Sequence, residues 1–218
     1  MSRDLAYGSE RLQTLDVYEP EEKASGAPVV VFVHGGGFTS GDKNPNPSLY
    51  SNVPIYFARK GLLGVTINYR LAPYAAWPAG AEDVSQAVSW LQANAAKYGG
   101  DPEKISLFGY SAGATHVASY IADRALQPMG GTGVAGVILV SGLYQVLPPG
   151  VKQASDNVKS YFGADASQYD ARSPVTHAAT SKVPVLLGQA EFDPPFLVRT
   201  AADLQAALCK RPNNCPQL

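Results

Sequence analysis

The chain has 218 residues, of which 45% are hydrophobic and 16% are charged. This balance is typical of one globular domain with a substantial buried core, and it excludes a disordered chain. Seventeen basic and eighteen acidic residues leave a net charge of −1 without any long run of one sign. The charge pattern therefore favours neither nucleic acid nor an anionic membrane surface as a partner.

Nothing in the sequence predicts a membrane span, because no run approaches the roughly 18–20 apolar residues that a spanning helix needs. The first ten residues also lack the apolar core of a signal peptide. Cys209 and Cys215 lie close together near the C-terminus, and a disulfide and two unpaired thiols are equally open readings. The sequence does not decide where the protein is located. A cytoplasmic location is open, and so is a periplasmic or secreted one if a signal was removed and the two cysteines pair.

Short apolar runs alternate with amphipathic stretches, which predicts an α/β fold with a mostly parallel sheet flanked by helices. We expect strands at residues 13–18, 29–33, 62–68, 104–108, 134–140 and 183–188, the first as an edge strand. Helices are expected at residues 54–60, 78–98, 112–125 and 195–208. The expected organisation is a single domain over residues 1–218. It carries a small lid-like insertion at about 142–183, in which residues 148–170 look irregular.

A G-x-S-x-G motif occupies residues 109–113, between a predicted strand and a predicted helix. This context suits a serine on a strained strand-to-helix turn, whose hydroxyl projects from the sheet and whose small neighbours admit close backbone approach. The sequence therefore predicts Ser111 as a nucleophile. The alternative is a serine that merely caps the following helix.

A glycine-rich loop, His34-Gly35-Gly36-Gly37-Phe38, directly follows the predicted strand 29–33. Acyl transfer develops a negative oxygen, which needs hydrogen-bond donors already aimed at its position. The backbone N–H groups of Gly36 and Gly37 are the predicted donors, together with that of Ala112, the residue after the serine. A phosphate-binding turn is the alternative, but the lysine and the Ser/Thr of a P-loop are absent.

These two loops resemble those of the hormone-sensitive-lipase-like branch of α/β-hydrolase carboxylesterases. Further similar blocks are NYRLAP at 68–73, WPA at 77–79, EDV at 82–84, YG at 7–8 and QTLDVY at 13–18. The resemblance covers nearly the whole chain, from about Leu5 to Leu218. It implies the α/β-hydrolase fold and hydrolysis of short-chain or aryl esters through an acyl-serine intermediate. It implies no metal and no organic cofactor, and a small-molecule ester as the substrate.

In this family the catalytic acid follows the seventh strand, and here that place contains Asp193 before two prolines. Asp193 is therefore the predicted acid, with Glu191 as its competitor. The structural alternative is that Asp193 only caps the helix expected from Pro195.

The sequence contains three histidines, and all three precede Asp193. The resemblance assigns His34 to bracing the glycine loop and His177 to a structural segment. We expect His116 to pack against the sheet rather than reach back to the serine. The resemblance thus predicts that the chain lacks the family's last strand, histidine loop and last helix, which would impair catalysis.

Two other functions stay open beside the esterase. One is an amidase of the arylformamidase kind, which uses a similar loop, although the third glycine, Gly37, favours the esterase. The other is a ligand-binding protein on the hydrolase fold without catalytic activity. Neither the oligomeric state nor the particular ester follows from the sequence.

Overall fold

The computed structural model describes residues 1–21, 25–46, 49–211 and 215–216. Within these residues the strands are β1 (Ser2–Ala6), β2 (Thr14–Tyr18), β3 (Ala27–Val33), β4 (Leu63–Ile67), β5 (Gly100–Tyr110), β6 (Gly136–Val140) and β7 (Val185–Gly188). The α-helices are α1 (Asn52–Arg59), α2 (Ala79–Asn94), α3 (Ala112–Ala122), α4 (Asp156–Phe162), α5 (Pro174–His177) and α6 (Pro195–Leu208). Short 3₁₀ turns lie at Ala95–Tyr98, Arg124–Leu126, Ala166–Gln168 and Ala178–Thr180.

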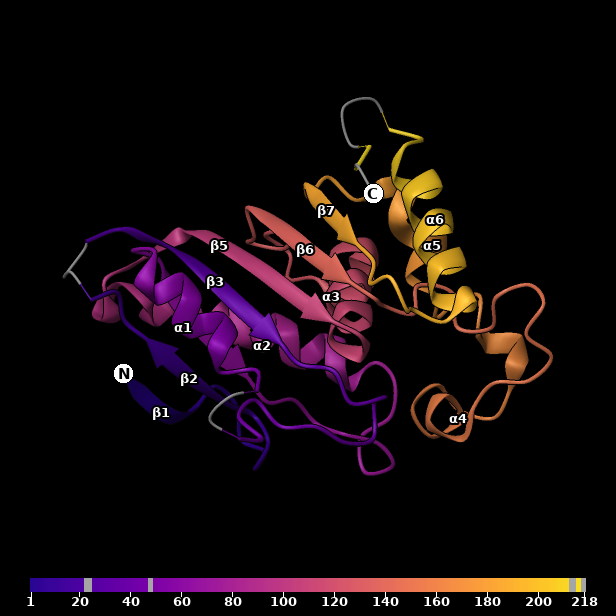
Figure 1. Cartoon of the computed structure of the whole chain (residues 1–218), viewed down its shortest axis with the longest axis horizontal. Helices are drawn as coiled ribbons and strands as arrows, with labels where there is room; N and C mark the ends of the chain where they lie inside the picture. Colours follow the sequence, from indigo (N-terminus) through magenta and orange to yellow (C-terminus); the bar gives the residue numbers. More distant parts are fainter. Residues whose placement is uncertain (22–24, 47–48, 212–214, 217–218) are drawn as a thin grey trace.

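The seven described strands form one sheet in the order β1-β2-β4-β3-β5-β6-β7 (Figure 1). The strands β4, β3, β5, β6 and β7 run parallel, whereas β2 is antiparallel to both of its neighbours. The predicted architecture, a mostly parallel sheet flanked by helices, is confirmed. Because the parallel strands share one direction, the loops that follow β3, β5, β6 and β7 meet at the same edge of the sheet.

The main core lies on one face of the sheet. There Val31, Val65 and Leu107, which are 0–1% exposed, pack with residues of α2, α3 and α6. Helix α1 packs on the opposite face. A Cβ at Gly64 of β4 would lie 2.1 Å from Pro54 O in that helix. The strands are therefore buried on both faces, which explains their continuous apolar sequence.

Two sequence predictions need correction. The strand over residues 13–18 is not at the edge, because β1 pairs with it and takes the edge position. The charges at Arg3 and Asp4, which suit an exposed edge strand, conceal β1 in the sequence. The stretch 148–170 is not wholly irregular either, because it contains α4, whose N-cap Ser155 accepts a hydrogen bond from Val158 N at 3.3 Å.

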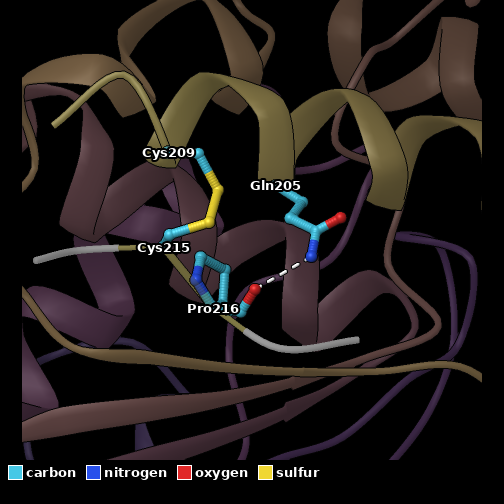
Figure 2. The surroundings of a disulfide bond; sticks show 4 residues. All are labelled: Gln205, Cys209, Cys215 and Pro216. Carbon is cyan, nitrogen blue, oxygen red and sulfur yellow. Dashed lines mark hydrogen bonds between the residues drawn. A yellow bond between two sulfur atoms is a disulfide. The ribbon is translucent and has the colours of Figure 1, made fainter. Parts of the chain in front are cut away.

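The cysteine pair is a disulfide in the structure. Cys209 ends α6 and is bonded to Cys215 (Figure 2). Nearby, Gln205 Nε2 donates a hydrogen bond to Pro216 O at 2.9 Å. The two contacts tie residues 215–216 to α6. In the described part of the chain, no helix is long and apolar enough to cross a bilayer.

Candidate active site

Ser111 lies at the sharp turn between β5 and α3. Its backbone has φ 53° and ψ −121°, a conformation that strains a residue with a side chain. The Ser111 N–H donates to Val140 O at the end of β6, at 2.9 Å, which ties the turn to the neighbouring strand. The Ser111 side chain does not cap α3. The geometry thus matches a nucleophile turn rather than an ordinary helix cap.

The glycines of the motif are required by close backbone contacts. A Cβ atom at Gly109 would lie 2.5 Å from Ala114 Cα, and one at Gly113 would lie 2.1 Å from Val33 O. Neither contact can be relieved by rotating a flexible side chain. The motif therefore has glycine at these two positions because α3 packs closely against the ends of β3 and β5.

The glycine loop has an unusual backbone conformation with φ of 136° at Gly36, 58° at Gly37 and 72° at Phe38. The carbonyl of Gly36 accepts hydrogen bonds from Ser40 N at 3.1 Å and Ser40 Oγ at 2.9 Å, which fixes that peptide. By contrast, no residue in the described ranges accepts a hydrogen bond from the N–H of Gly36, Gly37 or Ala112. Backbone donors seldom stay unpaired in a folded chain, so these three are suited to a bound oxyanion.

The serine and the glycine loop face each other. A Cβ atom at Gly35 would lie 3.0 Å from Ser111 Cβ. The contact arises because β3 and β5 are neighbours in the sheet, so that their following loops meet. A carbonyl group held at Ser111 would therefore lie beside the unpaired N–H groups of the loop.

His34 contacts this loop and Tyr69, which agrees with the bracing role that the resemblance implies. Its ring stacks on Tyr69 with centroids 4.4 Å apart, and Nδ1 lies 2.6 Å from Gly35 O. Tyr69 Oη donates to His34 O at 2.8 Å. Burial lowers the pKa of His34, so the ring stays neutral and acts as a structural support.

Asp193 lies in the loop after β7, beside the end of β6. Its Oδ2 accepts hydrogen bonds from Ser141 Oγ at 2.7 Å and from Ala190 N at 2.9 Å. The N-cap position of α6 is Pro194 rather than Asp193. Its competitor Glu191 is exposed and bonds no other residue of the described chain. The geometry thus favours Asp193 as the fixed carboxylate on the same edge of the sheet as Ser111.

None of the three histidines contacts Ser111 or Asp193 through a hydrogen bond within the described residues. His116 is 1% exposed within α3. Its ring lies edge-on to Phe38 and Tyr69, at 5.5 and 4.7 Å between centroids, and against Gly80 of α2. Burial lowers the pKa of His116 to about 3. It is therefore a neutral core residue.

His177 lies on α5, away from the turn between β5 and α3 that carries Ser111, here called the elbow. Its Nε2 lies 2.9 Å from Ala171 O and 3.9 Å from Asp123 Oδ2. These contacts agree with the structural role that the resemblance implies. The described residues thus bring together the serine, the carboxylate and the candidate oxyanion donors, but no histidine in the position of a general base.

Sequence reasoning missed two features of the site. The first is Ser141, which follows β6 with φ 55° and holds Asp193. Its place at the carboxyl end of a parallel strand could have drawn attention to it. The second is a buried aromatic cluster that joins α4 to the glycine loop. We name it the aromatic cluster; its members are Phe38, Trp77, His116, Tyr161 and Phe162.

A cavity of about 230 Å³ lies between residues 143–158 and the start of α6. Its apolar lining includes Leu143, Val158 and Phe196. The N–H of Leu143 donates to Thr115 Oγ1 at 3.0 Å, one turn of α3 after Ser111. The cavity is thus close to the elbow and smaller than the usual pocket for a drug-sized ligand. No group of His, Cys, Asp or Glu side chains in the described ranges is arranged to hold a metal ion.

Comparison with known proteins gives consistent matches. The profile of the BD-FAE family matches residues 15–208. Esterase LipQ of Mycobacterium tuberculosis is 31% identical over 226 residues, covering 94% of this chain and 52% of LipQ. Phenmedipham hydrolase of Pseudarthrobacter oxydans is 30% identical over 191 residues, covering 82% of this chain and 37% of that protein. The chain thus spans about half or less of the length of these curated relatives.

Solved structures match the fold as a whole. A putative thioesterase from Silicibacter sp. TM1040 superposes with a TM-score of 0.77 at 25% identity, covering 99% of this chain and 76% of that chain. The apo form of Thermogutta terrifontis esterase 2 superposes with a TM-score of 0.77 at 23% identity, covering 97% of this chain and 81% of that chain. Both likenesses extend over nearly all of the chain.

Proposed function

Since the chain belongs to the BD-FAE family of α/β-hydrolase esterases, we propose that it hydrolyses carboxylic esters through an acyl intermediate on Ser111. The observation that carries the proposal is the strained Ser111 turn, which faces a loop with unpaired backbone donors. Asp193 is the proposed acid, and Gly36, Gly37 and Ala112 are the proposed oxyanion donors.

The proposed substrates are short-chain or aryl esters. A cavity of about 230 Å³ with an apolar lining would hold a short acyl chain or one aromatic ring, but not a long lipid tail.

The proposed reaction needs a base that takes the proton of Ser111 Oγ as the oxygen attacks the carbonyl. His34 and His116 are buried with lowered pKa values, and His177 is bonded to Ala171 O. We therefore propose that the 218-residue chain by itself hydrolyses esters slowly. Loss of one member of a triad costs about 10⁴-fold or more in kcat.

The direct test of the nucleophile is a fluorophosphonate probe with intact-mass detection. Imidazole is present in both reactions to accept the proton of Ser111 Oγ as the oxygen displaces fluoride at phosphorus. One adduct should then form on the wild-type chain and none on Ser111→Ala. Labelling that survives Ser111→Ala would disprove the nucleophile. An unlabelled wild-type chain would favour the ligand-binding alternative.

Added imidazole tests the missing base. Imidazole can accept the Ser111 proton in place of a histidine, so we expect it to accelerate hydrolysis of an alkyl ester by the wild-type chain. Ser111→Ala is the matched control, because it subtracts the hydrolysis that imidazole catalyses in solution. A base already present in the chain would make the wild type fast and insensitive to imidazole. Under the same conditions, faster cleavage of N-formylkynurenine than of an aryl acetate would favour the amidase alternative.

A further inference from the structure

Helix α4 is fixed against the glycine loop by the aromatic cluster. The rings of Tyr161 and Phe38 stack with centroids 5.1 Å apart and planes 6° apart. Tyr161 is 1% exposed, and its Oη accepts a hydrogen bond from Gly80 N at 3.0 Å. Buried packing on this scale holds a helix in one position. The part of the insertion that contains α4 is therefore a fixed wall beside the loop.

Asn157 lies one helical turn before Tyr161 and so on the same side of α4. Phe38, the partner of Tyr161, directly follows Gly37 in the chain. Accordingly Asn157 meets Gly37: its Nδ2 lies 2.9 Å from the position that a Cβ atom on Gly37 would occupy. The absence of a side chain at Gly37 makes room for this amide.

The amide of Asn157 has no protein partner among the described residues, and the residue is exposed. Its NH₂ group carries two donor hydrogens. An amide placed beside the oxyanion loop and left unpaired is available to a bound substrate. Side-chain amides serve as oxyanion donors in other acyl-transfer sites.

We propose that Asn157 donates a hydrogen bond to the acyl oxygen of the ester, on which negative charge develops beside Gly37. This inference rests on the proposed function at Ser111. It assigns part of the oxyanion site to the insertion, so that α4 takes part in transition-state binding as well as in shaping the pocket.

The test measures the second-order rate constant of Ser111 labelling by a fluorophosphonate, whose phosphoryl oxygen stands in for the oxyanion. Every reaction contains the same concentration of imidazole, which accepts the proton of Ser111 Oγ. Asn157→Leu keeps the size of the side chain and removes the donors, and we expect labelling to fall about 10–100-fold. Asn157→Asp keeps the shape but presents acceptors only, and it should label at least as slowly. Asp156→Asn is the matched control, because that side chain is fully exposed on the same helix.

The outcomes separate this inference from the proposed function. Slow labelling of both Asn157 variants, with an unchanged melting temperature and normal labelling of Asp156→Asn, supports the donor. Wild-type rates in Asn157→Leu overturn it while Ser111 stays the nucleophile. An equal loss in Asp156→Asn also overturns it, because the cause is then a general disturbance of α4. A wild-type chain that does not label at Ser111 overturns the proposed function and this inference together.

Discussion

His116 makes the stability of the protein depend on pH. The ring is 1% exposed, and it is surrounded by Phe38, Tyr69 and Tyr161, none of which carries a charge near neutral pH. Its Nε2 has no hydrogen-bond partner among the residues that the structure describes. Protonation would place an unpaired charge in this apolar environment, which is why burial lowers the pKa of His116 to about 3 from 6.5.

The direction of the pH dependence follows from the protonation of His116 in the folded and the unfolded chain. Below pH 6.5 the unfolded chain binds a proton at His116, whereas the folded chain stays neutral there until about pH 3. The contribution to stability is therefore complete above pH 6.5 and is lost as the pH falls. Because the unfolded chain binds one more proton than the folded chain, the free energy of unfolding falls by about 1.4 kcal/mol for each pH unit below 6.5. The loss reaches about 5 kcal/mol at pH 3.

The assay is urea unfolding at a series of pH values between 4.5 and 7. His116→Asn removes the titrating group, and His116→Phe removes it while keeping a ring. We expect the slope of unfolding free energy against pH to fall by about 1.4 kcal/mol per unit in both variants. His34, whose pKa is also lowered, contributes to the slope of every protein and cancels in the difference. His177→Asn, which changes a half-buried histidine outside the aromatic cluster, is the control. A wild-type slope in the His116 variants would refute the reasoning.

Three further predictions concern stability and association. Tyr161→Ala should lower the free energy of unfolding, measured with urea, by about 3–5 kcal/mol. Tyr161→Phe leaves the buried Gly80 N–H without its acceptor and should lower it by about 1–3 kcal/mol. Losses below about 1 kcal/mol in both variants would contradict a fixed α4. Reduction of the Cys209–Cys215 disulfide, which closes a short loop, should lower the unfolding free energy by about 2 kcal/mol, and an unchanged value on adding reductant would oppose this. The edge strand β7 exposes 57% of Leu186 and should promote self-association; light scattering should show less of it in Leu186→Lys, and a monomeric wild type would contradict the prediction.

The fold was largely predictable because its strands are buried on both faces. Continuous apolar runs, such as the one that forms β3, leave little choice of structure. The helix expected from Pro195 to Leu208 has those bounds in the structure. The strand expected from Lys104 begins earlier in the structure, at Gly100, which pairs with Ala27. The stretch between Gly100 and Lys104 is polar, so no apolar run marks this part of β5 in the sequence. Only tertiary pairing extends the strand there.

The candidate site was predictable only where backbone geometry restricts the residue type. The elbow and the glycine loop require glycine at fixed positions, so they appear as motifs. Ser141 and Asn157 carry no such restriction. Each is placed by the packing of segments far apart in the chain, Ser141 against Asp193 and Asn157 against Gly37. A pattern confined to neighbouring residues cannot report such contacts.

The strained residues of the site depend on the surrounding fold. Phe38, Ser111 and Ser141 all have positive φ, between 53° and 72°, and each such residue costs of order 1–3 kcal/mol. Each is held by a specific contact: Phe38 by the aromatic cluster, Ser111 through its N–H to Val140 O, and Ser141 through its N–H to Gly188 O at 3.2 Å. Two of these contacts join the ends of neighbouring strands, and the third joins the glycine loop to α4. The sheet therefore holds Ser111 and Asp193, the proposed nucleophile and acid, whereas the shape of the glycine loop depends on α4. Changes in α4 should accordingly alter binding at the proposed oxyanion donors before they alter the position of Ser111.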